Sequence, residues 1–488
     1  MQITVIGTGY LGAVHAAGMA AIGHDVLGVD ADPDKIAALA RGEAPFYEPG
    51  LPELLRSGVA SGRLRFSTSI EEAAAFGDVH FVCVGTPQTP GSDSADMRFV
   101  DAVVTGLAEH ATRPALVVGK STVPVGTARR LSALVDAVAP DAGLRVAWNP
   151  EFLREGFAVE DTLRPDRLVF GVEASEDETV LRSVYAPVIA QGLPVFATDL
   201  ETAELVKVAA NAFLATKISF INAMAEVCET VGADVRTLAD AIGQDTRIGR
   251  RFLSAGVGFG GGCLGKDIRA FRARTTELGV GHATAFLEDV DRVNDRRRQR
   301  VVDLTTAALD GSVTGRRVTV LGATFKPNSD DVRDSPALWV ARRLHELGAV
   351  VTVHDPAGLE NARRAAPELR TALSVVAASV GAEVLLHLTE WDEYAELDPA
   401  DLDRIADGRV LVDGRNTLDR ARWAAHGWTV HGLGRPVVEP ADGRRSPALS
   451  VLPTPSSGDA TPVSPTTSET GAPVSVPAAH VAQEAAVA

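Results

Sequence analysis

The sequence has few cysteines and few aromatic residues, and its longest apolar runs are short. Three cysteines among 488 residues are too few for a disulfide framework, so we expect a reducing compartment. No apolar run approaches the ~20 residues that a membrane-spanning helix needs. The N-terminus, MQITVIGTGY, shows no basic leader before its strand pattern. These shortages predict a cytoplasmic protein that does not insert into a membrane.

Basic residues are also scarce relative to acidic ones. The chain has 47 Lys and Arg against 64 Asp and Glu, which gives a net charge of −17. Binding nucleic acid requires a basic surface that neutralises phosphates, so no nucleic-acid partner is expected. Lysine is rarer still, because six of the 47 basic residues are lysine: Lys35, Lys120, Lys207, Lys217, Lys266 and Lys326. A lysine loses its proton more easily than an arginine, so each could have a specific role, although chance explains any single one equally well.

Apolar strands alternate with helical stretches in two parts of the chain. They run from residue 3 to 150 and again from residue 317, which predicts an α/β protein with two Rossmann-like, doubly wound parallel sheets. Between them, residues 201–231 contain no glycine or proline and predict one helix of about 30 residues. Helical patterns then continue to about residue 308. We therefore predict a first domain over 1–198, a central helical domain over 199–310 and a second α/β domain over 311–435.

The composition changes after residue 435. Nine prolines lie between Pro436 and the end of the chain, and there is no aromatic residue. Such a segment buries too little apolar surface to offset its chain entropy. Residues 436–488 are therefore predicted to form a disordered tail.

A glycine-rich turn follows the first strand. Gly7, Gly9 and Gly12 form a GxGxxG motif between a strand and a helical stretch, and Asp30 ends the next strand. This context is typical of a dinucleotide site, in which the glycines let a diphosphate approach the helix N-terminus and the acid binds a ribose diol. Asp30 favours NAD over NADP, and Lys35 could pair with Asp30 or reach the cofactor. A Rossmann-like fold that binds another nucleotide is the alternative.

One of the three cysteines lies in an unusual loop, GVGFGGGCLGKD over residues 256–267. Cys83 and Cys228 lie in an apolar strand and a helix, where a thiol is usually a small buried hydrophobe. Glycines flank Cys263 on both sides, so a ligand could approach its backbone closely. Lys266 could favour the thiolate, since a nearby cation lowers a thiol pKa. We interpret Cys263 as a catalytic nucleophile, with a structural loop as the alternative.

Two further pairs of polar residues have helical spacing. Lys207 and Asn211 are four residues apart and would share one face of the long helix. Asn149 and the proline after it predict a helix start, which would place Glu151 and Glu155 on one face as well. Spacing alone does not separate a functional role from a solvated helix face, or from a first-turn acid that complements the helix dipole.

Taken together, these stretches resemble the UDP-glucose/GDP-mannose dehydrogenase family over about residues 1–435. The motifs that carry the resemblance are GTGYLG, PFYEPGLPELL, VGTP, STVPVGT, NPEFLREG, NAFLATKISFIN, RIGRRFL, GFGGGCLGKD and FKPNSDDVRDSP. The resemblance implies oxidation of C6 of a nucleotide sugar from alcohol to carboxylate with two NAD and one water. It also implies that the second α/β domain holds the UDP moiety and that the chain forms a homodimer through the central helix. No metal site is predicted.

The resemblance also implies catalytic roles for individual residues. Cys263 would capture an aldehyde as a thiohemiacetal that is then oxidised to a thioester. Lys207 and Asn211 would steady the oxygen at C6, and Asp267 would order water or the lysine. Glu151, together with Thr122, would position and activate the water that hydrolyses the thioester.

Further residues are implied as ligand contacts. Those implied for NAD are Gly7, Gly9, Leu11, Gly12, Asp30, Lys35, Thr86, Thr122, Glu155, Lys266 and Arg333. Those implied for the nucleotide sugar are Glu151, Phe152, Leu153, Arg154, Glu155, Lys207, Asn211, Phe252, Leu253, Ser254, Ala255, Gly256, Gly260 and Lys326.

The sequence departs from the family pattern at the cysteine loop and leaves alternatives open. The family commonly reads GGSCFPKD, whereas Gly262, Leu264 and Gly265 stand here for Ser, Phe and Pro; Gly265 costs more chain entropy than proline would. GDP-mannose or another hexose nucleotide is the alternative substrate, although RIGRRFL favours the UDP-glucose branch. A two-electron NAD dehydrogenase would have no use for Cys263. A nucleotide-sugar-binding regulator without turnover would not need the set of candidate catalytic residues.

Overall fold

The computed structural model describes residues 1–440, and residues 441–488 lie outside the described residues. The first three residues of the predicted tail have regular structure, because the last strand covers Arg435–Val438. This strand pairs with its neighbour in an antiparallel hairpin. The tail predicted from residue 436 therefore starts too early, and most of it lies outside the described part of the chain.

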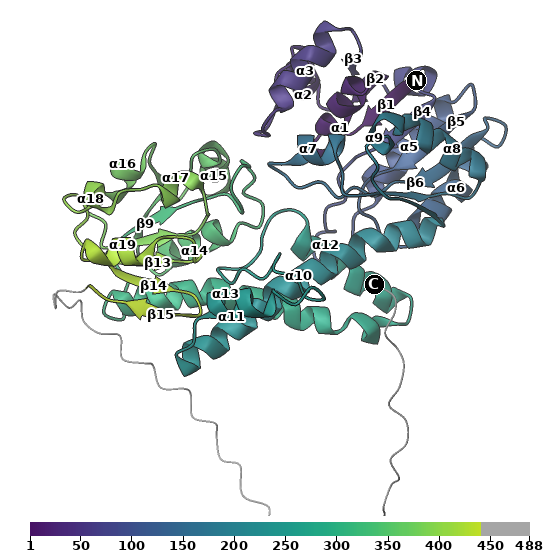
Figure 1. Ribbon diagram of the computed structural model, residues 1–488. Coiled ribbons are helices and arrows are strands. Elements are labelled where there is room, and N and C mark those ends of the chain that lie inside the picture. Colours follow the sequence, from purple (N-terminus) through teal and green to yellow (C-terminus); the bar gives the residue numbers. More distant parts are fainter. Residues whose placement is uncertain (441–488) are drawn as a thin grey trace, which may run out of the picture. The chain divides into compact units, whose positions relative to one another are not determined.

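The first α/β unit is an eight-stranded sheet in the order β3-β2-β1-β4-β5-β6-β7-β8 (Figure 1). All neighbouring strands are parallel except β6 and β7. The strands are β1 (Gln2–Ile6), β2 (Asp25–Val29), β3 (Leu64–Ser67), β4 (Val79–Val82), β5 (Ala115–Gly119), β6 (Leu144–Trp148), β7 (Leu168–Gly171) and β8 (Val195–Thr198). The strand order reverses between β1 and β4, which is where open parallel sheets bind ligands.

Helices cover both faces of this sheet. They are α1 (Tyr10–Ala21), α2 (Pro33–Ala40), α3 (Leu51–Ala60), α4 (Ile70–Phe76), α5 (Arg98–His110), α6 (Thr127–Val138), α7 (Ala158–Leu163), α8 (Ser175–Val184) and α9 (Ala186–Ile189). One apolar core joins the sheet to α1, α3, α7, α8 and α9, and a second joins it to α4, α5 and α6. The inner strands, such as β4, β5 and β7, are buried on both sides, as is typical of parallel sheets, whereas the edge strands β3 and β8 are partly exposed.

The second α/β unit is a seven-stranded sheet in the order β11-β10-β9-β12-β13-β14-β15. Its strands are β9 (Arg317–Leu321), β10 (Val350–His354), β11 (Arg370–Thr371), β12 (Val384–His387), β13 (Val410–Asp413), β14 (Thr429–Gly432) and β15 (Arg435–Val438). Its helices are α14 (Pro336–Glu346), α15 (Leu359–Ala365), α16 (Val375–Ser379), α17 (Asp392–Ala395), α18 (Pro399–Leu402) and α19 (Arg420–Ala425). The prediction of two Rossmann-like sheets is confirmed.

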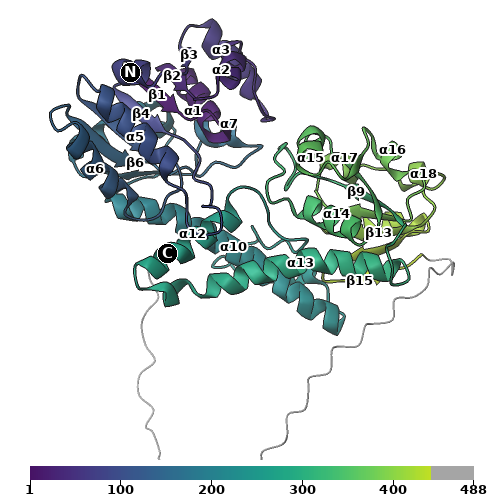
Figure 2. The same cartoon turned by 180° about the vertical axis from the view of Figure 1, so that it is seen from behind.

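The central segment is built on α10 (Leu200–Val231), a helix of 32 residues. Asp199 caps its start by accepting the Thr202 N–H at 2.7 Å, and Gly232 ends it with a φ of +75°. The remaining elements are α11 (Val235–Ile242), α12 (Leu264–Glu277), the 3₁₀ helix η1 (Gly281–Thr284) and α13 (Phe286–Ala308). Both α12 and α13 pack along α10 (Figures 1 and 2).

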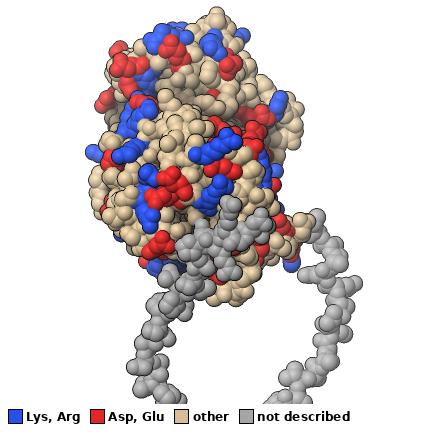
Figure 3. All heavy atoms as spheres, turned by 90° about the vertical axis from the view of Figure 1, so that its left-hand side faces the viewer, with Lys and Arg blue, Asp and Glu red and all other residues tan. Residues whose placement is uncertain are grey.

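By length and composition, α10 is also long and apolar enough to cross a membrane, although it contains no continuous apolar run of that length. Its packing against α12 and α13 accounts for this composition, because a core helix carries apolar residues for the same reason. The buried residues of α10 also include charged and polar side chains, among them Glu204, Lys207 and Asn211. On the face in Figure 3, Lys and Arg side chains are interleaved with Asp and Glu side chains.

One local prediction is wrong. The residues from Asn149 and Pro150 to Glu155 do not form a helix, and the helix that follows begins at Ala158. Asn149 does not cap a helix, because its side chain turns into the protein and donates to the Val169 carbonyl at 2.9 Å. Glu151 and Glu155 therefore do not share a helical face, and their positions are fixed by contacts with other elements.

Candidate active site

The turn between β1 and α1 has the geometry of a diphosphate site. Gly7 adopts a φ of +92°, and a Cβ there would lie 2.8 Å from Val84. A Cβ on Gly12 would lie 1.7 Å from the Gly7 carbonyl oxygen, whereas one on Gly9 would meet nothing within 4 Å. The turn is thus tightly packed at Gly7 and Gly12, whereas the space next to Gly9 is open. The first turn of α1 has no side-chain cap and no acid, so its N–H groups and helix dipole can receive an anion.

Asp30 lies beside this turn at the end of β2. Its carboxylate accepts the Thr8 N–H at 2.8 Å and the Lys35 ammonium at 3.0 Å. Partial burial would raise the pKa of Asp30, but these hydrogen bonds outweigh burial and keep it below its ordinary value. Lys35 therefore pairs with Asp30, one of the two predicted possibilities. Among residues 1–440, one Asp30 oxygen accepts a single hydrogen bond, from the Asp32 N–H, and it can also accept a ribose hydroxyl.

A buried ion pair joins α10 to the segment after β6. Lys207 Nζ lies 2.9 Å from Glu151 Oε1, and the two side chains are 7% and 12% exposed. The other Glu151 oxygen accepts the Leu153 N–H at 2.7 Å. Burial acts to lower the pKa of Lys207, but the carboxylate of Glu151 and the neighbouring Cys263 and Asp267 together raise it above its ordinary value. Lys207 is therefore a charged group inside the protein and not part of a solvated helix face.

A second buried carboxylate, Asp267, connects α10 with α12. It is 2% exposed and accepts the Asn211 amide at 2.7 Å and the Lys266 ammonium at 2.9 Å. Lys266 also donates to the Thr86 hydroxyl at 3.3 Å, and that hydroxyl donates to the Thr122 carbonyl at 2.7 Å. Residues that were singled out in four separate motifs are thus joined in one chain of hydrogen bonds.

Cys263 stands directly before α12, and its carbonyl accepts the Asp267 N–H at 2.8 Å. The residue keeps exposed surface, whereas Cys83 and Cys228 are buried as predicted. Desolvation of the sulfur, followed by the carboxylates of Asp267 and Glu151, raises the pKa of the Cys263 thiol to about 11, and Lys207 opposes this rise.

Lys266 has other partners in this structure, and its effect on the Cys263 thiol stays a prediction. Its ammonium is engaged by Asp267 and Thr86, and Lys207 is the cation that lowers the thiol pKa. We therefore expect Cys263 to be a thiol at neutral pH when no ligand is bound.

Alkylation of Cys263 tests this protonation state. Because iodoacetamide reacts with the thiolate, its rate with the ligand-free enzyme should rise about tenfold per pH unit from about pH 7 to about pH 10. The rate is measured by mass spectrometry of the peptide that contains Cys263, with Cys83 and Cys228 as buried internal controls. A rate that levels off below about pH 9 would contradict a raised pKa.

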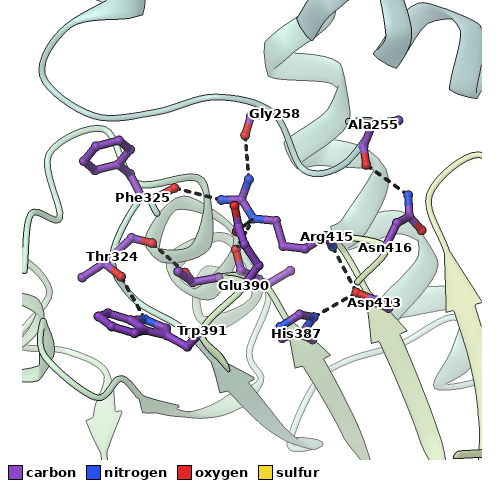
Figure 4. A network of polar contacts seen from close by, with 12 residues as sticks. Ala255, Gly258, Thr324, Phe325, His387, Glu390, Trp391, Asp413, Arg415 and Asn416 are labelled. Carbon is purple, nitrogen blue, oxygen red and sulfur yellow. Dashed lines mark hydrogen bonds and ion pairs between the residues drawn. The ribbon is translucent and has the colours of Figure 1, made fainter. Parts of the chain in front are cut away.

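Buried polar side chains hold the backbone of the glycine-rich loop. Asn294 on α13 accepts the Phe259 N–H at 2.8 Å and donates to the Phe259 carbonyl at 3.0 Å. From the loop after β13, the Arg415 guanidinium donates to the carbonyls of Gly258 and Phe325 (Figure 4). Asn416, beside it, donates to Ala255. The loop that carries the thiol is therefore anchored to α13 and to the second sheet.

Residues 151–155 also contact the loop after β9. Arg333 pairs with Glu155 at 3.1 Å and with Asp331 at 2.6 Å, and the Ser329 hydroxyl donates to Glu155 at 3.2 Å. Burial, followed by the Asp331 charge, raises the pKa of Glu155. Burial lowers the pKa of Lys326, and the carboxylate of Glu155 opposes this shift. Residues predicted to contact cofactor and sugar nucleotide therefore meet here.

The other predicted contacts are less closely connected to this cluster. The Phe152 ring lies 5.7 Å from Lys207 Nζ, whereas Arg154 pairs outward with Asp161. Phe252 is 40% exposed with a φ of +65°, an uncommon conformation for a bulky residue. The rest fall into three groups. Leu11 and Leu153 pack on the first core; Leu253, Ala255, Gly256 and Gly260 are buried; and Ser254 is exposed.

The sequence did not predict several contacts in and around this cluster. Tyr10 donates to Asp330 at 2.5 Å, and Glu48 accepts the N–H groups of Gly156 and Ala158 at the start of α7. Glu48 lies in the PFYEPGLPELL motif, which therefore marked the segment but not the role of this residue. For Asn294 and Arg415 no sequence signal was available, because their roles depend on contacts between distant elements.

The fold and the site define a class of protein. The dinucleotide turn and the acid that follows the second strand are features of a nucleotide-dependent dehydrogenase.

Sequence profiles identify the family. Residues 1–189, 201–296 and 319–420 match the NAD binding, central and UDP binding domains, respectively, of the UDP-glucose/GDP-mannose dehydrogenase family. The chain belongs to this family, and its cofactor is NAD.

Known proteins with similar sequences agree with this assignment. The chain is 44% identical over 440 residues to UDP-glucose 6-dehydrogenase of Rhizobium meliloti, covering 89% of this chain and 100% of that protein. It is 39% identical to UDP-glucose 6-dehydrogenase YwqF of Bacillus subtilis, with 90% and 99% coverage. The structure of a UDP-glucose dehydrogenase from Pyrobaculum islandicum is 40% identical and has a TM-score of 0.83, with 89% and 98% coverage. The predictions of the family and of an NAD-dependent oxidoreductase are confirmed.

Proposed function

We propose that the protein oxidises UDP-glucose to UDP-glucuronate with two NAD and one water, through a thioester on Cys263. The observation that carries this proposal is the buried cluster around that cysteine, in which Lys207 pairs with Glu151 and Asn211 with Asp267. A two-electron alcohol dehydrogenase needs no nucleophile. The relatives named above, which act on UDP-glucose by their names, support the choice of sugar nucleotide.

The chain offers NAD a complete set of contacts. The open space above Gly9 and the free N–H groups of α1 suit the diphosphate, and Asp30 suits a ribose. Lys35, Thr86, Thr122, Glu155, Lys266 and Arg333 are the further proposed contacts. When bound, NAD accepts one hydride in each of the two oxidations.

In the first oxidation the chain stabilises the charge that develops on the C6 oxygen. The Lys207 ammonium and the Asn211 amide are donors held in place by carboxylates, and preorganised donors act most strongly where charge appears in the transition state. The alcohol loses a hydride and a proton and becomes an aldehyde. Cys263 sulfur then bonds to C6, and the thiol proton is transferred to the aldehyde oxygen, which forms a thiohemiacetal.

The second oxidation removes the hydride from C6 and the proton from the hydroxyl of the thiohemiacetal, which leaves a thioester. Water then adds to C6, the C–S bond breaks, and carboxylate, thiol and one proton are released. Glu151, with Thr122, is the proposed base that positions this water. Asp267 keeps Asn211 and Lys266 in place throughout.

The sugar nucleotide is proposed to contact residues 151–155, Phe252–Gly256, Gly260 and Lys326. Lys326 supplies a cation on the loop after β9 of the UDP binding domain.

The ratio of kcat/KM for UDP-glucose to that for GDP-mannose tests the choice of substrate. A ratio above about 10² is expected, since buried groups that recognise one base are left unpaired by the other. A preference for GDP-mannose would overturn this choice and leave the cysteine chemistry in place.

We also propose a cytoplasmic homodimer that forms through α10. Phe213, Phe220, Val227 and Val231 are 50% to 68% exposed, and their spacing of seven, seven and four residues places them on one face of the helix. The resemblance to the family implied pairing through this helix, and a second copy would cover the apolar face. The three free cysteines fit a reducing compartment.

The oligomeric state tests the proposed dimer. Phe213→Glu combined with Phe220→Glu should convert the protein to a monomer, because charges in an apolar interface lose their hydration. Light scattering during size-exclusion chromatography gives the mass directly. Phe196→Glu, at an equally exposed position on β8, is the control and should stay dimeric. A wild-type protein that is monomeric would contradict the proposal.

A further inference from the structure

Lys120 is a buried lysine without an acidic partner. It is 6% exposed, and its ammonium donates to the Asn149 side-chain oxygen at 3.0 Å and to the Tyr185 hydroxyl at 3.3 Å. Both acceptors are neutral. Within residues 1–440, no carboxylate oxygen lies within the 4.0 Å that defines an ion pair with Lys120. Lys120 differs in this respect from Lys35, Lys207 and Lys266, which pair with carboxylates.

A charge in this position is costly for the folded protein. Lysine is almost never fully buried unless it is paired, and desolvation of an ammonium disfavours its charged form. Burial lowers the pKa of Lys120 to about 8; Cys83, followed by Glu151, opposes this shift, and Lys207 adds to it. A methionine side chain would fill a similar volume at no such cost, so packing alone does not explain a lysine here.

The ammonium lies where two candidate catalytic segments leave the sheet. Lys120 directly follows β5 and Asn149 directly follows β6, and the Asn149 N–H donates to the Gly119 carbonyl at 2.8 Å. Two residues beyond Lys120 is Thr122, and two residues beyond Asn149 is Glu151. Residues 149–155 are not helical, and side-chain contacts link them to other elements, among them Lys120 with Asn149 and Lys207 with Glu151.

We propose that Lys120 is a positioning residue for the dehydrogenase reaction, which fixes Asn149 and places an unpaired positive charge beneath the segment that carries Glu151. This inference rests on the proposed function. Inside a protein a charge acts over a longer range than in water, so the ammonium stabilises the anionic species formed when water attacks the thioester.

Lys120→Met is the main test. The substitution leaves no polar group unpaired, because the Tyr185 hydroxyl still donates to Asn149 at 2.6 Å. We expect kcat with UDP-glucose to fall about 10- to 100-fold, with the KM for NAD changed less than about threefold. The Tm should equal or exceed that of the wild type, since replacing a buried charge by an apolar group is often neutral or stabilising. A structural lysine would instead lose stability together with activity.

Tyr185→Phe is the matched control, since it removes a hydroxyl from the same network and keeps the charge. Its kcat should stay within about threefold of the wild-type value. Lys120→Gln keeps a hydrogen-bond donor without the charge and should lose as much kcat as Lys120→Met; it also replaces that variant if the methionine protein does not fold. The proposal would be overturned by any of three results: a wild-type kcat in the two Lys120 variants, a lowered Tm in both of them, or a loss of kcat in Tyr185→Phe equal to theirs. Failure of the proposed function would be seen separately, as a wild-type enzyme that does not oxidise UDP-glucose. In that case the Tm of the Lys120 variants, compared with that of the wild type, still tests whether Lys120 is a structural residue.

Discussion

Replacing Cys263 by alanine is expected to abolish formation of UDP-glucuronate. Without the sulfur no thioester forms, so the second oxidation loses its covalent intermediate, and the steady-state rate of acid formation should fall at least about 10³-fold. Acid formation is measured by chromatography of the sugar nucleotides together with NADH absorbance. Uronate formed at the wild-type rate would contradict the thioester mechanism.

The Cys263→Ala protein should otherwise be intact. Cys263 lies at the exposed start of α12, and the dinucleotide turn around Gly7–Gly12 belongs to a different segment, so the Kd for NAD should stay within about twofold of the wild-type value. Cys228→Ala is the control for cysteine removal, because Cys228 is buried in α10 and should be dispensable for acid formation. A Cys263→Ala protein that no longer binds NAD would point to misfolding instead of lost chemistry.

Replacing Lys207 by methionine should give the second largest loss. The change removes the cation that is proposed to stabilise charge on the C6 oxygen, and loss of such a group typically lowers kcat about 10²- to 10³-fold. It also leaves Glu151 without its partner, and breaking a buried ion pair destabilises a protein by about 3–5 kcal/mol. Steady-state kinetics and thermal unfolding measure the two effects separately.

Lys217→Met is the matched control, because the same substitution is made on the same helix. Lys217 Nζ donates to the Ile248 and Gly249 carbonyls at 2.9 and 3.2 Å. Among residues 1–440 it has no acidic partner that the substitution would leave unpaired. Its kcat should remain within about threefold of the wild-type value. Equal losses in the two variants would show that α10 tolerates no such change, and would remove Lys207 from the mechanism.

The fold could be predicted because its signals are local. The absence of glycine and proline over 201–231 indicated α10, and buried parallel strands such as Val79–Val82 show as short apolar runs in the sequence. The helix predicted from Asn149 failed because cap-like residues also serve other contacts. Here Asn149 is bonded to Val169, Lys120 and Tyr185, and tertiary contacts outweighed the local preference.

The candidate site could be predicted only in part. The motifs named Cys263, Lys207, Asn211 and Asp267, and the structure brings these residues together, but their catalytic roles remain predictions. Protonation was harder to predict. Sequence proximity suggested that Lys266 would act on the cysteine, whereas the nearest effective cation is Lys207, 56 residues earlier in the chain. Electrostatic effects depend on distances in space, which spacing along a chain does not supply.

The number of NADH molecules formed per molecule of UDP-glucose tests the central claim most directly. With limiting UDP-glucose and excess NAD, the four-electron reaction predicts two NADH and one UDP-glucuronate for each UDP-glucose consumed. One NADH per UDP-glucose, with an aldehyde as the product, would contradict the account. It would show a two-electron dehydrogenase in which Cys263 does not carry a thioester.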